Sequence, residues 1–142
     1  MQLTIKNKDL NTLYRVLDKI KITNMRANRG RAKLLAKVEG KLSEYAKDEV
    51  DIIDQYAQKD KDGKFVIDER KNIKLADPTK IDELNDLLSE LGNEDITIKG
   101  HEYSKRFIDF LEYLAESEDE FTSDEIIIID NILEEFEESK GE

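Results

Sequence analysis

The chain has 142 residues, of which 40% are charged, and its formal net charge is −11. It contains no cysteine, which excludes disulfides, thiolate metal sites and cysteine nucleophiles. No apolar run approaches the length of about 18 residues that spans a bilayer, and residues 1–10 lack the apolar centre of a signal peptide. We therefore expect a cytoplasmic protein without membrane contact, and a chain of this length can fold as one domain, residues 1–142.

The charge is distributed unevenly along the chain. Residues 1–41 contain eleven Lys or Arg and three acidic residues, a net charge of +8, whereas residues 42–142 carry −19. Such asymmetry favours electrostatic recognition of a partner or head-to-tail association between copies. The basic segment can equally neutralise part of the acidic remainder within one fold.

The first 22 residues are expected to form a strand and then a helix. Gln2–Lys6 alternates polar and apolar residues, as is typical of a half-buried strand. Asn7 is a candidate N-cap, and apolar residues recur at helical spacing over residues 8–20.

A long helix is predicted over residues 24–58, which contain no proline. Its apolar residues fall three, four or seven positions apart, the spacing of an a/d heptad seam: Leu35, Val38, Leu42, Tyr45, Ile52 and Tyr56. A helix of about 30 residues is longer than one small core can cover. The seam should therefore pair with a later helix of the chain or with the same helix of a second subunit, and a homodimer is the expected oligomer.

Residues 60–76 predict a turn followed by a β-hairpin. The turn is Asp60–Lys64, and the two short strands are Phe65–Ile67 and Ile73–Leu75. The stretch Gln58–Glu69 also has the spacing of a calcium-binding EF-hand loop. Gln58 stands where that loop has aspartate, however, so the turn is the favoured interpretation.

The remainder, residues 77–138, is predicted to be mainly helical. Asp77-Pro78 is a typical helix start with Asp77 as N-cap, and Ile96–Ile98 is a short strand candidate. The last helix begins with the capping-box pattern Thr122–Glu125 and continues through Ile126–Ile129, a run expected to be deeply buried or at a subunit interface.

These elements predict an α+β fold that is predominantly α. A long heptad-bearing helix lies in a helical bundle with shorter helices and a small β-hairpin. No internal repeat is recognised in the sequence.

Few residues suggest catalysis. The single histidine, His101, is expected at the surface or near a helix start, because one histidine without cysteine does not complete the usual nucleophile–base pair. General-acid catalysis needs a carboxyl group whose burial raises its pKa, which hydrophilic acidic runs do not provide. We expect no catalytic, cofactor-binding or metal-binding residue.

Two charged surfaces are candidates for binding. A basic patch comprises Arg26, Arg29, Arg31 and Lys33. It lacks interleaved aromatic residues, so direct nucleic-acid binding is not expected, although its arginines could clamp a phosphate ligand. An acidic face could imitate the phosphates of DNA and occupy the basic groove of another protein. It comprises Glu116, Glu118, Asp119, Glu120, Glu134 and Glu135.

Three stretches, Leu3–Leu10, Arg29–Leu35 and Tyr56–Phe65, resemble an uncharacterised family of short acidic proteins encoded by tailed phages and prophages of Gram-positive bacteria. The resemblance covers residues 2–98 and implies a phage product acting in the bacterial cytoplasm. The expected function is a non-enzymatic interaction protein that binds and inhibits or redirects a host protein, such as a defence nuclease. The alternatives are a chaperone-like adaptor in phage assembly and a protein that sequesters a phosphate ligand or nucleotide.

Overall fold

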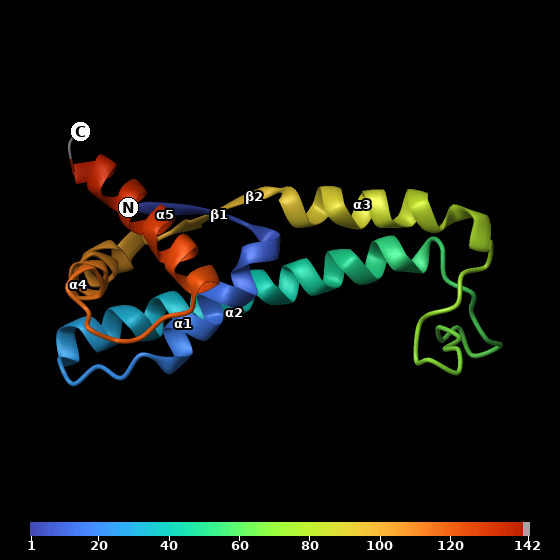
Figure 1. The fold of residues 1–142 in the computed structure, drawn as a ribbon, viewed down its shortest axis with the longest axis horizontal. Coiled ribbons are helices and arrows are strands. Elements are labelled where there is room, and N and C mark those ends of the chain that lie inside the picture. The colour runs from blue at the N-terminus through green and yellow to red at the C-terminus, as the bar shows by residue number, and fades with distance from the viewer. Residues whose placement is uncertain (141–142) are drawn as a thin grey trace. The chain divides into compact units, whose positions relative to one another are not determined.

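The computed structural model describes residues 1–140 and is mostly helical (Figure 1). The predicted α+β, predominantly α fold is confirmed. Where the sequence suggests a single domain, the chain divides into two compact units. The first, here called the core unit, comprises Met1–Leu42 and Asp95–Glu142, and the second, the insert unit, comprises Ser43–Glu94.

A two-stranded antiparallel sheet joins distant segments of the core unit. β1 (Gln2–Lys6) pairs with β2 (Asp95–Lys99), so that Gln2 lies opposite Lys99 and Lys6 opposite Asp95. Both strands lie where the sequence predicts them. Leu3, Ile5 and Ile98 are buried beneath the sheet, while the intervening residues are more exposed, as alternation along a strand requires.

The helices of the core unit follow the predicted order. α1 (Leu10–Lys19) follows a 3-10 turn, Asn7–Asp9, and α4 (Ser104–Ala115) and α5 (Ser123–Lys140) end the described chain. α2 (Met25–Asp54) begins in the core unit and ends in the insert unit.

The ends of α1 and α2 differ in how they are capped. Asn7, the predicted N-cap, is a buried residue of the 3-10 turn that leads into α1, and the residue directly before α1 is Asp9. Asn24 caps α2, since its side-chain oxygen accepts a hydrogen bond from the Ala27 N–H at 3.1 Å.

The largest fully buried side chains all belong to the core unit. They are Phe107, Phe110, Leu3, Leu10, Leu17, Leu34, Ile98, Leu111, Val16 and Val38. α2 supplies Leu34 and Val38, which lie one turn apart on the same face. The predicted seam starts at Leu35, but the residue that is buried at this point of α2 is Leu34. Leu34 is 1% exposed, whereas Leu35 is only half-buried.

Gly30 allows α2 to approach α4 closely. A Cβ atom at this position would lie 1.9 Å from the backbone carbonyl oxygen of Arg106 and 2.9 Å from the Cβ of Phe110. Both distances are far below van der Waals contact, and the carbonyl belongs to the backbone of α4. The crossing of the two helices therefore requires glycine.

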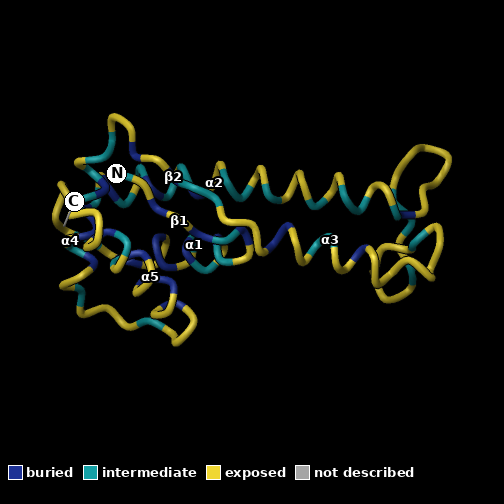
Figure 2. The backbone as a smooth tube through the Cα atoms, turned by 90° about the horizontal axis from the view of Figure 1, so that it is seen from above, coloured by how far each residue is buried: buried dark blue, intermediate teal, exposed yellow. Residues whose placement is uncertain are grey.

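The insert unit is a pair of helical segments with a small irregular domain between them. Its helices are the end of α2 and α3 (Ile81–Asn93), which run side by side (Figure 1). Residues 55–80, here called the knob, connect their neighbouring ends. Most of this unit is exposed (Figure 2), and its buried residues are Ala57, Leu84, Leu91 and Gly92.

The knob is built on an eight-residue repeat of backbone hydrogen bonds. The N–H groups of Gln58, Lys74 and Val66 donate to the carbonyls of Lys74, Val66 and Gln58 respectively, at 2.8–2.9 Å. These three hydrogen bonds close a triangle whose corners, Gln58, Val66 and Lys74, follow one another at intervals of eight residues along the chain. The backbone therefore forms three arms around one centre.

The pairing within the arms corrects the predicted hairpin of residues 60–76. Isolated antiparallel bridges join Lys59 to Phe65, Ile67 to Ile73 and Ala57 to Leu75. Of the two predicted strands, only Ile67 and Ile73 pair with each other. The ends of those strands have other partners, since Phe65 pairs with Lys59 and Leu75 with Ala57.

Two turns of the knob have the same hydrogen bonds. Oδ1 of Asp60 accepts the N–H groups two and four residues later, at 2.8 and 3.0 Å, and Oδ1 of Asp68 does the same at 2.8 and 2.9 Å. The left-handed position falls on Gly63 (φ 79°) in the first turn and on Lys71 (φ 66°) in the second. The turn Asp60–Lys64 is therefore confirmed, with its carboxylate holding the backbone.

Asp77 starts α3 as predicted. Its Oδ1 accepts hydrogen bonds from the hydroxyl of Thr79 at 2.7 Å and the backbone N–H of Thr79 at 3.0 Å. These bonds stabilise the carboxylate, so they lower the pKa of Asp77 below its ordinary value. Pro78 occupies the first position of the 3-10 turn that leads into α3.

Candidate functional site

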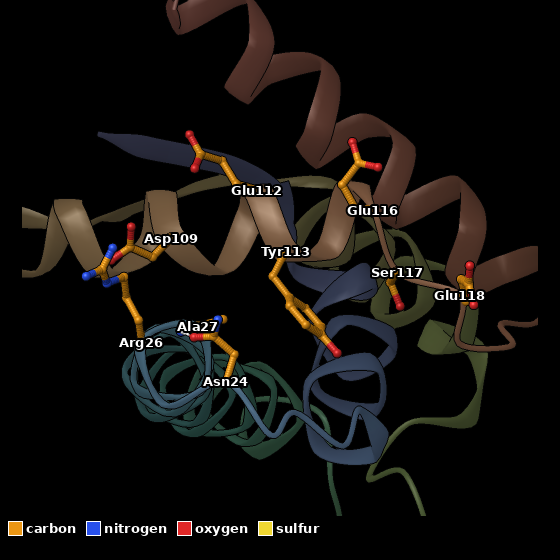
Figure 3. A pocket seen from close by; sticks show the side chains of 9 residues that line it. All are labelled: Asn24, Arg26, Ala27, Asp109, Glu112, Tyr113, Glu116, Ser117 and Glu118. Atoms are coloured by element: carbon orange, nitrogen blue, oxygen red, sulfur yellow. Dashed lines mark hydrogen bonds between the residues drawn. The ribbon is translucent and has the colours of Figure 1, made fainter.

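The candidate site is an acidic hollow of about 530 Å³ in the core unit (Figure 3). Its lining residues come from the start of α2, from α4 and from the loop after α4: Asn24, Arg26, Ala27, Asp109, Glu112, Tyr113, Glu116, Ser117 and Glu118. The lining contains four carboxylates and one cation, Arg26. Two predicted residues of the acidic face, Glu116 and Glu118, meet here, and Asp109, Glu112 and Tyr113 join them.

The hollow suits a ligand with positive groups. Glu112, Glu116 and Glu118 are exposed, so a bound lysine or arginine side chain would remain partly hydrated. Each such ion pair contributes up to about 1 kcal/mol. Affinity at this surface would therefore come from several contacts made together.

The other residues of the predicted acidic face lie apart from the hollow or serve the fold. Glu120 and Glu134 are exposed, and Asp119 accepts a hydrogen bond from the hydroxyl of Ser117 at 2.6 Å. Glu135 of α5 accepts the backbone N–H of Thr4 at 2.8 Å and its hydroxyl at 3.0 Å. Glu135 thus attaches α5 to β1.

The residues of the predicted basic patch have different positions and contacts in the structure. Arg26 lines the hollow and Arg29 is exposed. The guanidinium of Arg31 donates to the side chain of Asn28 and to the carbonyl of Leu17 at the end of α1, both at 2.8 Å. Because Arg31 is used inside the fold, the three arginines do not converge on a phosphate site.

Lys33, the last residue of the basic patch, lies over an aromatic ring. Its Nζ is 4.5 Å from the centroid of Tyr103, and the guanidinium carbon of Arg106 is 5.3 Å from the same centroid. Both cations therefore make a cation–π contact with the Tyr103 ring, and the contact from Lys33 links α2 to the start of α4.

The predicted seam extends across both units. Val38 is fully buried in the core unit, while Leu35 and Leu42 are half-buried there, as are Tyr45 and Ile52 in the insert unit. Pairing of this seam with a second subunit stays a prediction.

Tyr56 does not belong to the helical seam, because α2 ends at Asp54. Its carbonyl accepts the N–H of Ala76 in the knob, and its hydroxyl donates to the carboxylate of Glu83 on α3. Burial and then this hydrogen bond raise the pKa of Tyr56. Tyr56 therefore joins the knob to α3.

The capping box at the start of α5 is confirmed. Oε1 of Glu125 accepts the N–H of Thr122 at 2.8 Å, and the N–H of Glu125 donates to the Thr122 hydroxyl at 3.3 Å. Lys19 of α1 donates to the same carboxylate oxygen at 2.6 Å. The bond from Lys19, followed by that from Thr122, lowers the pKa of the buried Glu125, which is opposite to the shift that a general acid needs.

The isoleucine run is divided between inside and outside. Ile128 and Ile129 are buried as expected, but Ile126 is 49% and Ile127 is 59% exposed. Successive residues of a helix point about 100° apart, so four in a row cannot all face one core. His101 is exposed, as expected, and adopts a left-handed conformation with φ 49°.

The family comparison covers the whole chain. Residues 1–142 match the family model described as "Protein of unknown function (DUF1617)". The chain belongs to the DUF1617 family. The uncharacterised family suggested by residues 2–98 is thereby supported over the full length, whereas no curated protein and no solved structure matches significantly.

Two further findings describe this DUF1617 protein. Within residues 1–140, no three histidine or acidic side chains gather in a way that could hold a metal ion. In the same part of the chain, the helices are either too short or too polar to cross a membrane. The surface features that it does present are the acidic hollow, the exposed acids of α5 and the exposed side chains of the knob.

Proposed function

We propose that this DUF1617 protein is a non-enzymatic interaction protein that binds and inhibits, or redirects, another protein. We place it as a product of a tailed phage or prophage of Gram-positive bacteria, acting on a protein in the cytoplasm of its host. The exposed carboxylates of Glu112, Glu116 and Glu118 on the rim of the acidic hollow support a partner with a basic surface whose side chains reach them.

The charge around the hollow supports the same kind of partner. Residues 95–140 contain fifteen acidic residues and four Lys or Arg. A surface of one sign attracts an oppositely charged protein over about one Debye length, roughly 10 Å at 0.1 M salt, and speeds the encounter. Binding should therefore be fast and should weaken as salt is added.

The chemistry of the ionisable groups supports binding over catalysis. The chain has no cysteine and one histidine, which is exposed. Within residues 1–140, the two carboxyl groups with clearly shifted pKa values are Asp77 and Glu125, and both are shifted downward by hydrogen bonds that hold helix starts. Downward shifts stabilise the carboxylate and disfavour proton donation at neutral pH.

An affinity capture with a charge-reversed variant tests the proposal. The full chain is immobilised and exposed to lysate of a Gram-positive host, and stoichiometric partners are identified by mass spectrometry. The double variant Glu116→Lys/Glu118→Lys should lose the partner, because it places two cations at the rim of the hollow. The matched control, Glu90→Lys on the exposed part of α3, should retain it.

Two outcomes would count against this function. If the folded wild-type chain recovers no stoichiometric partner, the binding proposal fails. If a partner is recovered equally well by the wild type and by the double variant, the acidic hollow is not the contact surface.

The alternative of a chaperone-like adaptor in phage assembly is favoured by exposed apolar side chains. Ile67 of the knob and Ile127 of α5 are each 59% exposed, and such residues can hold apolar segments of a client. In this version the recovered partner is a phage protein. Light scattering should also show a defined oligomer, such as the expected homodimer, and a strict monomer would argue against it.

A further inference from the structure

The first half of α2 carries only positive side-chain charges. Residues 25–38 contain five Lys or Arg and no acidic residue. Arg29, Lys33 and Lys37 follow one another at intervals of four residues, so they form a stripe along one side of the helix with a rise of about 6 Å between neighbours. Glu39, the next acid of α2, points about 160° away from Lys37. The stripe therefore has no carboxylate of its own helix beside it.

The start of α4 adds further cations to this stripe. Lys33 of α2 and Arg106 of α4 lie over the ring of Tyr103, at 4.5 and 5.3 Å from its centroid. A cation–π contact leaves the charge of each cation in place, because the ring has no net charge. Lys105 precedes Arg106 and is exposed. The two helices thus present five cations, here called the basic face: Arg29, Lys33, Lys37, Lys105 and Arg106.

Two carboxylates lie near the basic face, and both count in full against its charge. Glu102 lies about one turn before Arg106 and Asp109 about one turn after it. Asp109 and Arg26 point toward each other at the border with the acidic hollow (Figure 3). With Arg26 included, six cations stand against two carboxylates, a net charge of +4. In the part of the chain that the structure describes, none of the five cations of the basic face forms an ion pair.

An aromatic ring lies among these cations. The sequence disfavours nucleic acid because no aromatic residue is interleaved with the basic residues of α2, but Tyr103 comes from another segment, the 3-10 turn His101–Tyr103 before α4. Its ring is half-buried beside Lys33 and Arg106. The flexible side chain of Lys33 can leave the ring for a phosphate, and a base can then stack in its place. Cations that follow the backbone and an aromatic ring for a base are the groups with which proteins bind single strands.

We propose that the basic face binds single-stranded nucleic acid. Arg29, Lys33 and Lys37 would follow the phosphates of one strand, while a base stacks on Tyr103 beside Arg106. A duplex would leave the ring unused, because its bases are already stacked within the helix. An acidic protein segment would meet the cations but has no base for the ring.

The acidic remainder of the chain limits this binding to the basic face. The whole chain has a net charge of −11 and repels a polyanion at a distance. At an ionic strength of about 0.15 M, however, charges are screened beyond about 8 Å, so a strand lying on the basic face is affected mainly by the charges beside it. We therefore expect moderate affinity. This binding does not rest on the proposed function, since it uses residues outside the acidic hollow.

Fluorescence polarisation with a labelled single-stranded DNA of about 15 nucleotides and the full chain provides the first test. We expect binding at low ionic strength. If four cations each meet a phosphate, the affinity should fall about fiftyfold between about 50 and 200 mM salt. No binding at low salt would overturn the proposal. Equally tight binding of a duplex of the same sequence, or equally effective competition by polyglutamate, would overturn it too.

A charge-reversed variant with a matched control provides the second test. Lys33→Glu/Lys37→Glu should weaken binding at least about tenfold, because two phosphate contacts become repulsive. The control Lys61→Glu/Lys64→Glu changes the net charge of the chain by the same amount at exposed positions of the knob. It should bind within about twofold of the wild type, since its charges lie outside the basic face. Equal losses in both variants would show that only net charge matters and would overturn the proposal.

Two variants of Tyr103 test the stacking. Tyr103→Ala should lose about tenfold in affinity, whereas Tyr103→Phe keeps the ring and should bind like the wild type. The chain has five tyrosines and no tryptophan, so stacking on Tyr103 should quench its tyrosine emission. This quenching should be smaller in Tyr103→Phe at equal saturation with DNA.

Circular dichroism checks that all variants keep their helices. Unchanged affinity in a folded Tyr103→Ala chain would overturn the proposal. Equal quenching in the wild type and in Tyr103→Phe would overturn it even if Tyr103→Ala does not fold. Failure here leaves the host-protein proposal standing, since that one is judged by partner capture.

Discussion

The core unit and the insert unit are stabilised by different kinds of interaction. In the core unit, ten large side chains from sheet and helices are fully buried. In the insert unit, the buried apolar side chains are Ala57, Leu84 and Leu91, and the knob is held by backbone hydrogen bonds and by turn carboxylates. Burial of one large apolar side chain contributes about 1.5–3 kcal/mol, whereas one hydrogen bond contributes about 1 kcal/mol net.

The two units therefore differ in the contacts on which their stability depends. The core unit depends on contacts between segments far apart in the chain, which form only when the whole unit folds. The insert unit buries few apolar side chains and depends more on hydrogen bonds between backbone groups near its surface. We therefore expect its amide protons to exchange faster with solvent, as local opening there exposes little apolar surface.

The largest effect is expected from Gly30→Ala in the core unit. The added methyl group would overlap the Arg106 carbonyl, so α2 and α4 must separate and the free energy of unfolding should fall by about 3 kcal/mol or more. Gly40→Ala in the same helix is the control, because nothing lies within 4 Å of its Cβ. It should raise stability by about 0.5–1 kcal/mol, as measured by urea denaturation. Equal effects of the two substitutions would contradict the close helix crossing.

Two valines of α2 sharpen the comparison between the units. Val38 is completely buried in the core unit, whereas Val50 is 50% exposed in the insert unit. Val38→Ala should cost about 2 kcal/mol through lost burial and a small cavity, and Val50→Ala should change stability by less than about 0.5 kcal/mol. Both values come from urea denaturation. A large loss for Val50→Ala would indicate that this side chain is covered in solution, as by a second subunit on the seam.

The buried ion pair of Glu125 should make the core unit sensitive to acid. Glu125→Gln removes the charge that Lys19 and the Thr122 N–H stabilise, and it should lower the free energy of unfolding by about 1–2 kcal/mol at neutral pH. In the folded chain the pKa of Glu125 is lowered. Its stabilising contribution is therefore complete above the unfolded pKa of about 4.3 and is lost as the pH falls through the lower folded pKa.

Denaturation of the wild type and of Glu125→Gln at several pH values measures this contribution. The difference between the two curves should be constant near neutrality and should shrink below the unfolded pKa. A difference that grows as the pH falls would have the wrong sign and would contradict the ion pair.

The smallest effects are expected in the knob, where the two equivalent turns provide a matched pair. Lys71 occupies the left-handed position that Gly63 occupies in the other turn. Lys71→Gly should relieve backbone strain and stabilise by about 0.5 kcal/mol, while Gly63→Ala should destabilise by about 1 kcal/mol. Hydrogen exchange of the knob amides should detect both effects, because it measures the local stability of each turn. Effects of the same sign would show that the two turns are not equivalent.

The features that the sequence predicted are local in chain distance. The cap at Asp77, the turn at Asp60 and the capping box at Glu125 each depend on residues within four positions, and each is confirmed. The pairing of β1 with β2 was not predicted, because it joins Leu3 to Ile98 and nothing in either strand specifies its partner. The eight-residue repeat of the knob was missed because its arms share backbone geometry more than side chains.

The candidate site also depends on a contact between distant segments, which could not be predicted from the sequence. Glu116 and Glu118 were recognisable as exposed acids, but the hollow that they border also needs Arg26 from α2 beside α4. That approach of two helices depends on Gly30, whose meaning is apparent only when the Arg106 carbonyl is seen against it. Likewise, a sequence pattern could not show that Glu135 and Arg31 are used within the fold.

The bond from Thr4 to Glu135 has a consequence for the behaviour of the chain at high concentration. A strand at the margin of a sheet offers unpaired N–H groups on which the strand of another molecule can be templated, which is how many β-proteins begin to aggregate. On β1 the Thr4 N–H is already occupied by a carboxylate from α5, as if by one residue of a third strand. A negatively charged helix therefore shields the outer side of this small sheet from cross-molecular strand pairing.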